Sequence, residues 1–325
     1  MDEEDEPFFC PRRTGDDLLQ RVIHRRIAMG AIGAERTRER CREHFLAMYD
    51  NLALRGLMPG GPFRLLDKEQ LWERAGAMLD GLDKYFEGMA KDGRFQECFP
   101  GLVLGDGSGR GLVHRMRDIP VQRFPALRLR AADRDVELHG ELPCLFRDPA
   151  DGRCTTLVFL DGLFKPRRLL PAFLFYAAAA ASDSQLGDWV RAAPFAIHYV
   201  YKKYPKSAKF ETGNWAPFRM TREQARDWLA DLAGTMLTGT DFDLLPFDLI
   251  AQDLAPQHGL ISGVDYAQTL RAGLEAAEDA PEWFAPYLPE SQVLLDPQVP
   301  DDAEAKIRRR LAPFFNFKLE PPRAG

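Results

Sequence analysis

The spacing of apolar residues predicts three amphipathic helices in the first hundred residues. Apolar side chains recur every three or four positions over residues 14–30, 34–54 and 67–93, the period of one helix face. Thr14 and the acids after it form a favourable helix start. Gly56 is placed to end the second helix. We therefore expect these stripes to be packed core.

Beyond residue 100 the pattern becomes the two-residue alternation of β-strands. We expect strands over residues 127–130, 136–139, 144–146, 155–160 and 196–201. The run 155–160 is apolar on both faces, which indicates a central strand. Residues 148–153 (DPADGR) predict a hairpin turn, the Gly- and Asp-rich stretch 101–111 predicts a loop, and residues 140–143 are expected to interrupt the sheet.

The remaining apolar stripes predict further helices. They span residues 169–181, 221–236, 266–277 and 303–311, and an aromatic tail at 314–317 is expected to occupy a groove. Thr221 and Gln224 form a capping box. Helices, then strands, then helices predict an α/β or α+β fold, a mixed sheet flanked by helices. We expect a helical part over 1–100, an α/β core over 101–255 and an acidic helical segment over 256–325.

Composition and charge narrow the class of protein. The chain has 325 residues, is 45% hydrophobic and has a formal net charge of −6. Residues 1–6 and 272–305 hold fourteen acids and no base, so the remainder is net basic and suited to attract phosphates. The longest apolar run, 169–181, is too short for a membrane span, and the acidic start does not resemble a signal peptide. Five unpatterned cysteines favour reduced thiols in the cytoplasm.

Motifs for nucleophilic, nucleotide-binding and zinc chemistry are absent from the sequence. It has no G-x-S-x-G, no phosphate-binding G-x-x-x-x-G-K-[ST] and no H-E-x-x-H. The predicted order is nevertheless that of the PD-(D/E)XK nuclease core: a strand, a hairpin, a second apolar strand and a helix. The site of such a nuclease needs clustered carboxylates that bind Mg²⁺, and a lysine.

That nuclease site is degenerate here. Pro143 stands where the first acid is expected, and Leu163 replaces the lysine that should follow Asp161. Glu137, Glu141 and Asp161 remain as possible ligands of a rearranged Mg²⁺ site. We expect no catalytic residues, no bound metal and no cofactor, and keep an active Mg²⁺-dependent nuclease as the alternative.

The strongest binding pattern is residues 195–210, where lysines and aromatic residues alternate without an acid. Lysines neutralise phosphates and aromatic rings stack on unpaired bases. A second basic cluster follows the central strand, and a third, of seven arginines, spans 110–134. The candidate DNA-binding residues are Lys202, Lys203, Tyr204, Lys206, Lys209, Lys165, Arg167 and Arg168. The alternative is that the tyrosines are core and the lysines only solvate a loop.

Several segments, in order, resemble one known family. They are residues 5–8 (DEPF) before Leu18-Leu19, residues 55–63 (RGLMPGGPF), residues 140–143 (GELP), residues 244–246 (LLP) and residues 313–317 (PFFNF). Together they make nearly the whole chain resemble the C-terminal portion of RecC, the gamma subunit of the RecBCD helicase–nuclease, exodeoxyribonuclease V.

The resemblance implies a nuclease-like fold that has lost its catalytic residues. In that bacterial complex the region is a scaffold that contacts RecB-type and RecD-type subunits and guides separated DNA strands during double-strand break repair and recombination. The full subunit is far longer, and its helicase-like portions have no counterpart in this chain. A scaffold that binds protein alone, without touching DNA, is a further alternative.

Overall fold

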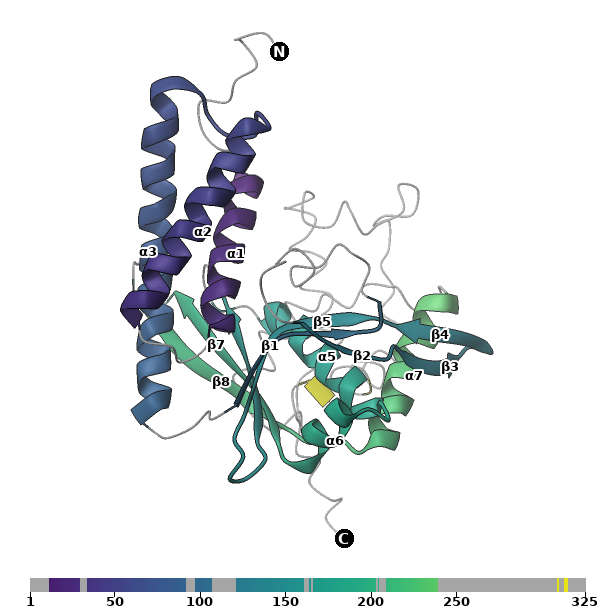
Figure 1. Cartoon of the computed structure of the whole chain (residues 1–325). Helices are drawn as coiled ribbons and strands as arrows, with labels where there is room; N and C mark the ends of the chain where they lie inside the picture. Colours follow the sequence, from purple (N-terminus) through teal and green to yellow (C-terminus); the bar gives the residue numbers. More distant parts are fainter. Residues whose placement is uncertain are drawn as a thin grey trace, which may run out of the picture.

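The computed structural model describes residues 12–29, 34–91, 97–106, 121–160, 164, 166–202, 204, 209–238, 309 and 313–314. Its first part is a bundle of three helices: α1 (Arg12–Ala28), α2 (Ala34–Leu54) and α3 (Gly61–Lys91). In Figure 1 the bundle stands at one end of a sheet, with the turn between α2 and α3 farthest from it.

The predicted stripes of the bundle are confirmed as core. Leu18, Val22, Ile23 and Ile27 of α1 are buried. After α2 the Leu57 amide donates to the Leu52 carbonyl and the Gly56 amide to that of Ala53, at 3.0 Å each, a Schellman motif that requires the left-handed backbone of Gly56, φ 70°. α3 begins at Gly61, six residues before the predicted start at residue 67. Pro62 can lie inside this helix because proline is tolerated in the first turn.

Six strands form one mixed sheet in the order β2-β1-β5-β6-β7-β8. They are β1 (Glu97–Leu104), β2 (Gln122–Phe124), β5 (Gly140–Arg147), β6 (Cys154–Phe159), β7 (Phe195–Lys202) and β8 (Phe210–Phe218). The pairs β1–β2 and β6–β7 are parallel and the others antiparallel. The mixed sheet and the central position of β6 are confirmed.

Two further strands, β3 (Leu127–Ala131) and β4 (Arg134–Leu138), form a separate two-stranded ribbon. The predicted alternation of β3 is confirmed, since Leu127, Leu129 and Ala131 are buried and the arginines between them are exposed. The predicted DPADGR turn is also confirmed: the Asp148 amide donates to the Arg153 carbonyl at 2.9 Å.

Several sequence-based predictions were wrong. Residues 101–104 belong to β1 and not to a loop, and residues 140–143 begin β5 instead of interrupting it. β8 and the helix α6 (Gln185–Ala192) were not predicted. Gly101 has φ 63° and lies opposite Pro143 at an irregular point of the β1–β5 ladder, which is how both strands accommodate residues typical of turns.

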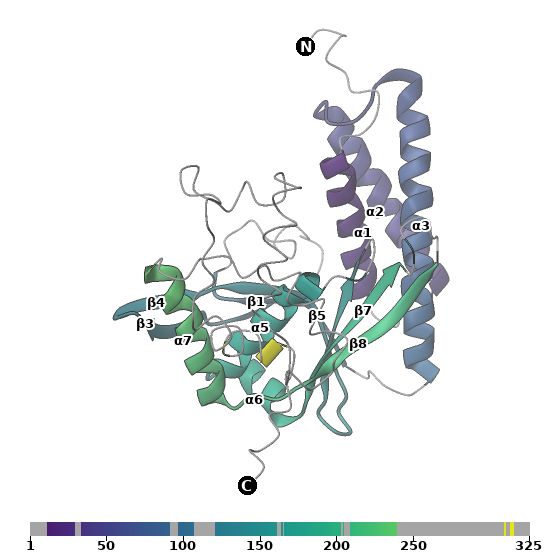
Figure 2. The ribbon, with the colours of Figure 1, turned by 180° about the vertical axis from the view of Figure 1, so that it is seen from behind.

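Helices cover both faces of the sheet (Figures 1 and 2). The bundle packs on one face, where its core includes Phe146, Leu157 and Val200 of the strands. The other face carries a short 3₁₀ turn η2 (Pro166–Leu169), α5 (Leu170–Ala181), α6 and α7 (Arg222–Thr238). The capping box of α7 is confirmed, with the Thr221 amide donating to Gln224 Oε1 at 2.9 Å.

Little of the acidic C-terminal segment is described. The helices predicted over 266–277 and 303–311 lie outside the described residues, apart from Arg309. Of the aromatic tail, Phe314 is buried against Trp215, as expected for a tail in a groove. Within the described part of the chain no helix has the length and apolarity needed to cross a membrane.

Candidate nucleic-acid interface

Two basic segments begin at the same end of the sheet. β6 and β7 are parallel neighbours with Phe159 paired to Val200, and the Leu160 amide donates to the Val200 carbonyl at 2.8 Å. The chain that follows β6 leads to Lys165, Arg167 and Arg168, and the chain that follows β7 leads to residues 203–209. Because the two strands are parallel, the two basic clusters, which are separate in the sequence, both begin at the C-terminal end of the β6–β7 pair.

Phe164 fixes the segment after β6 against β7. Its ring stacks on Tyr199, with centroids 4.5 Å apart and an interplanar angle of 24°, and lies 6.0 Å from the ring of Tyr201 and 5.7 Å from that of Trp215. Sequence analysis did not single out Phe164. The available signal was a lone aromatic residue shortly after the central strand in the sequence.

Most aromatic residues of the 195–210 segment are therefore structural. Tyr199 and Tyr201 are half-buried, burial raises the pKa of Tyr199, and the Tyr201 hydroxyl donates to Glu211 at 3.1 Å. The Tyr199 ring lies across Gly213, where a Cβ would come within 2.3 Å of it. These contacts support the alternative prediction that the tyrosines are core residues. Their rings are therefore poorly placed to stack on bases.

His198 faces the helical bundle. Its Nδ1 lies 2.7 Å from the Tyr85 hydroxyl, and the two rings meet edge to face at 5.8 Å. This histidine therefore joins the sheet to α3 and is not presented to a ligand. Phe210 also packs inward, 5.1 Å from the ring of Phe159.

The described residues that are exposed in these two segments are two basic residues and one tyrosine. Arg168 and Lys209 are exposed, and Tyr204 has 61% of its surface accessible. The Lys202 ammonium lies 5.6 Å from the centre of the Phe210 ring, a cation–π contact that holds it at the strand end. Lys165, Lys203 and Lys206 lie outside the described residues, and only the backbone of Arg167 is described.

The positions of the degenerate nuclease site are partly described. Pro143 lies within β5 and is half-buried. Beyond the pairs Phe146–Thr155 and Arg147–Cys154, the Thr156 hydroxyl donates to the Cys144 carbonyl at 2.8 Å, so a side chain bridges β5 and β6 there. Asp161 and Leu163 lie outside the described residues.

The other carboxylates considered as Mg²⁺ ligands lie on different elements. Glu137 is on β4, where its carboxylate accepts from Arg128 at 2.7 Å. Glu141 is on β5, opposite Val103. Among the described residues no group of three or more His, Cys, Asp or Glu side chains is placed to hold a metal ion.

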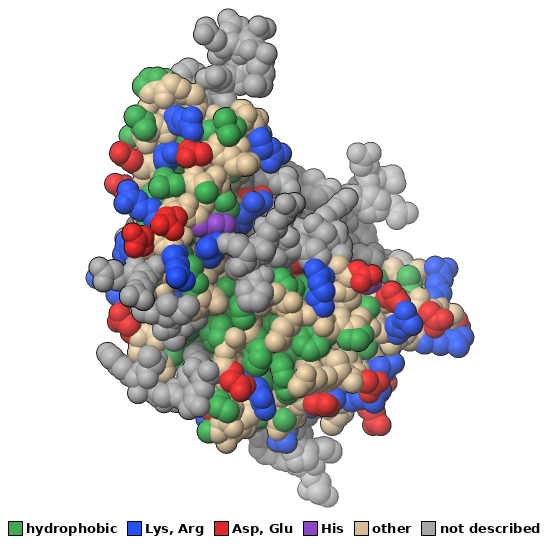
Figure 3. Space-filling model, in the orientation of Figure 1, with side chains coloured by type: hydrophobic (Ala, Val, Ile, Leu, Met, Phe, Trp, Pro, Cys, Tyr) green, Lys and Arg blue, Asp and Glu red, His purple; other side chains and the backbone are tan. Residues whose placement is uncertain are grey.

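The third basic cluster does not join the first two. Its described arginines lie on β2, the edge strand on the far side of the sheet from β7 and β8, and on the separate β3–β4 ribbon (Figure 1). On the face in Figure 3 the β3–β4 end shows acidic and basic side chains intermixed. Arg128 is paired with Glu137, and Arg130 lies 3.8 Å from Asp133. This end consequently has less excess positive charge than the sequence count indicated.

Comparison with known proteins gives no match: neither a protein-family model, nor a curated protein, nor a solved structure matches the chain. A functional assignment therefore has to come from the chain's own residues.

Proposed function

We propose that this chain is a non-catalytic, nuclease-like domain of the RecC type that contacts single-stranded DNA and supports subunit assembly during double-strand break repair. The observation that most supports the DNA contact is the common origin of two basic segments at the β6–β7 end of the sheet. The degenerate PD-(D/E)XK positions and the RecC-like segments of the sequence support the rest. Its partners would be RecB-type and RecD-type subunits in the bacterial cytoplasm.

The exposed groups suit an unpaired strand better than a duplex. Lysine ammonium groups neutralise phosphates along the backbone, and Tyr204 offers a ring to a base that is not already stacked. None of these groups reads a base edge in a fixed geometry, so binding would not depend on sequence. This matches the guidance of strands that another subunit has separated.

The DNA contact is tested by fluorescence anisotropy with a labelled single-stranded oligonucleotide. We expect binding that weakens with salt. The salt slope should be smaller in Lys202→Ala/Lys209→Ala, by about 0.7 for each phosphate that a lysine no longer neutralises. Tyr204→Ala should cost about 1–3 kcal/mol of binding free energy. The matched control is Arg134→Ala, an exposed cation on β4 at the other end of the sheet.

Two results would count against the DNA contact. One is an absence of salt-dependent binding, which would favour the protein-only scaffold. The other is an equal effect of the edge substitutions and Arg134→Ala, which would show that only net charge matters. Co-purification with RecB-type and RecD-type subunits at high salt tests the assembly role separately, because ionic DNA bridges are weak there.

The absence of catalysis is tested by digestion of linear DNA with Mg²⁺ or Mn²⁺. We expect no cleavage above that of a buffer blank. Cleavage that requires the metal and is lost in Asp161→Ala would establish the alternative, a nuclease with a rearranged site. Cleavage that survives Asp161→Ala and disappears from protein purified by a second route would indicate a contaminating enzyme.

A further inference from the structure

The helical bundle contains a pocket that the proposed DNA contact does not use. It has a volume of about 710 Å³ and lies between α1, α2 and the turn that follows α2. Its apolar lining consists of Leu18, Ala47, Met48, Leu52 and Leu57. The other lining residues are polar or charged: Thr14, Asp17, Arg21, His44, Asn51 and Arg55. Small-molecule sites have this size and combine apolar walls with polar groups that fix orientation.

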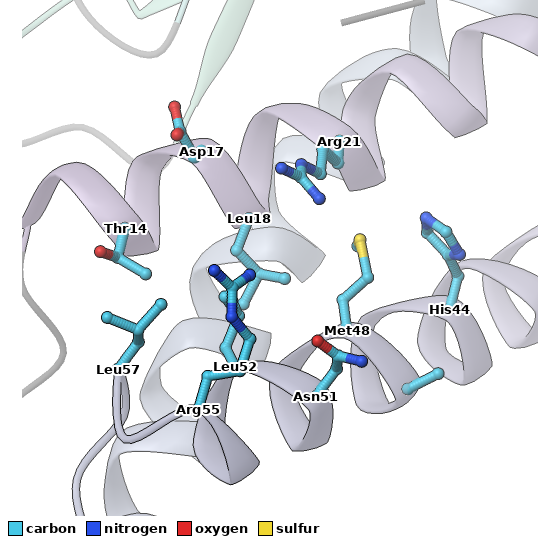
Figure 4. Close-up of a pocket in the computed structure, with 11 residues that line it drawn as sticks. Thr14, Asp17, Leu18, Arg21, His44, Met48, Asn51, Leu52, Arg55 and Leu57 are labelled. Carbon is cyan, nitrogen blue, oxygen red and sulfur yellow. The ribbon is translucent and has the colours of Figure 1, made fainter. Parts of the chain in front are cut away.

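Two arginines give the pocket its charge. Figure 4 shows Arg21 of α1 and Arg55, just after α2, extending into the space between the helices, whereas the Asp17 carboxylate points away from it. No carboxylate among the described residues pairs with either guanidinium. Asp17 is the only acid among the described residues of the lining, so their charged side chains leave one positive charge in excess.

Two other arginines of the bundle are paired with carboxylates. Arg26 pairs with Asp83 at 2.7 Å, and Arg74 pairs with Asp16 at 2.9 Å. In contrast to these pairs, the Nε of Arg21, like that of Arg25, is buried and has no hydrogen-bond partner in the described structure. A buried donor without an acceptor is costly. No group of the described structure neutralises the Arg21 guanidinium, and its terminal nitrogens could donate to an anion in the pocket.

His44 adds a neutral donor to the same wall. Its Nδ1 lies 3.2 Å from Arg25 Nη1, and because arginine only donates, Nδ1 accepts and the ring proton is on Nε2. Burial and then the charges of Arg25 and Arg21 lower the pKa of His44 to about 4. The cationic character of the pocket at neutral pH therefore comes from the arginines.

We propose that this pocket binds an amphipathic organic anion, with its carboxylate or phosphate head on Arg21 and Arg55 and its aliphatic body against Leu18, Met48 and Leu52. Guanidinium groups favour oxygen anions of this kind because they donate two parallel hydrogen bonds. Among the described lining residues the His44 imidazole is the only aromatic ring, and the lining has no Phe, Tyr or Trp, so a nucleotide base would find little surface to stack on. Met48 adapts readily to aliphatic chains of different shape.

Isothermal titration calorimetry of the full chain tests the proposal with four probes: octanoate, octyl phosphate, octanol and acetate. We expect octanoate or octyl phosphate to bind at one site, and the stronger of the two identifies the head group. Octanol, which lacks the charge, and acetate, which lacks the chain, should each bind at least about tenfold more weakly.

Matched variants locate the site. Arg21→Gln and Arg55→Gln should each weaken binding of the preferred anion by about tenfold or more, and Arg21→Lys should restore part of it. Arg42→Gln removes an exposed cation of α2 that does not line the pocket, and should leave affinity unchanged. Urea unfolding of each variant separates a defect in binding from a defect in folding, and Arg55 is exposed enough for its replacement to be tolerated.

Three outcomes would overturn the proposal. These are no binding of either anion, equal binding of octanol, or equal affinity in Arg55→Gln and Arg42→Gln. None of these measurements involves DNA, so the pocket and the proposed DNA contact can fail independently.

Discussion

The hydroxyl of Tyr85 adds a polar contact to the apolar packing between the helical bundle and the sheet. Tyr85 of α3 is buried, and its oxygen lies 2.7 Å from Nδ1 of His198 on β7. Tyr85→Phe keeps the ring packing and removes this bond. We expect the free energy of unfolding, from urea denaturation, to fall by about 1 kcal/mol. Tyr204→Phe, at a residue that is 61% exposed, should cost less, and equal losses would contradict a structural role for the Tyr85–His198 contact.

His24 makes the free energy of unfolding depend on pH. Burial lowers the pKa of His24 on α1 to about 4, from an ordinary 6.5. The folded state therefore resists protonation of His24. The contribution of this residue to the free energy of unfolding is constant above pH 6.5 and falls as the pH drops from there toward 4. Between pH 7.5 and 5 we expect a loss of about 2 kcal/mol from this residue.

Urea unfolding at these two pH values checks the expectation with His24→Phe. The variant keeps a ring of similar size and cannot be protonated, so its stability should change less between the two conditions. An unchanged difference between pH 7.5 and 5 would show that other groups cause the acid sensitivity.

At single residues, the sequence pattern drew attention to the 195–210 segment but did not predict where each of its side chains packs. Lysines and aromatic residues in 195–210 predicted a binding strand, yet Tyr199 and Tyr201 lie in an aromatic cluster with Phe164. Strand alternation divides residues between two faces but does not say what covers each face. The residue that covers this one, Phe164, comes from another segment and could not be predicted from local pattern.

At the scale of elements, α5 and α6 approach so closely that only glycine fits between them. A Cβ on Gly187 would lie 2.5 Å from the Ser182 carbonyl oxygen and 2.8 Å from that of Ala179. The same carbonyl of Ser182 accepts from Arg191 of α6 at 2.7 Å. Gly187→Ala must separate the helices, and we expect it to lower the free energy of unfolding by about 1–3 kcal/mol.

The matched control is Gly88→Ala in α3, where an added Cβ would meet nothing within 4 Å. Alanine favours helix over glycine by up to about 1 kcal/mol, so this variant should be slightly more stable than the parent chain. Thermal unfolding of both variants decides the point. Opposite shifts in midpoint are expected, and a stabilised Gly187→Ala would show that α6 can move away at no cost.

Elements with a clear period were predictable, and those containing turn residues were not. The stripes of α1 and α2 required no tertiary information. β1, β5 and β8 contain Pro100-Gly101, Pro143, and Gly213 with Pro217, residues that predict turns by local propensity. They are accommodated because β8 is an edge strand, Gly213 gives room to Tyr199, and Gly101 lies opposite Pro143.

At the scale of the whole molecule, the sheet is covered by helices from both ends of the described chain. The bundle core incorporates Phe146 and Leu157, so the helical part shares its core with the strands. Sequence analysis placed the helical and α/β parts in order but could not show this, because hydrophobic period does not specify which apolar faces meet. The common origin of the two basic segments depends on the same long-range pairing.

The far end of the chain contributes to the opposite core. Phe314 is buried, stacks on Trp215 with centroids 5.3 Å apart, and accepts a hydrogen bond at its carbonyl from Trp215 Nε1 at 2.9 Å. Its ring also meets Phe173 of α5 at 5.3 Å. Its ring therefore fills space between β8 and α5, although Phe314 is far from both elements in the sequence.

Phe314→Ala would leave that space empty, and we expect the free energy of unfolding to fall by about 3–5 kcal/mol. Arg309→Gln tests whether the loss comes from the ring or from general attachment of this segment, because Arg309 is ion-paired with Asp231 at 2.9 Å but is largely exposed. An exposed pair contributes at most about 1 kcal/mol. Urea denaturation should thus separate the two variants widely. If they lost the same small amount, Phe314 would be an accessory contact, and the core between β8 and α5 would be complete without the C-terminal aromatic residue.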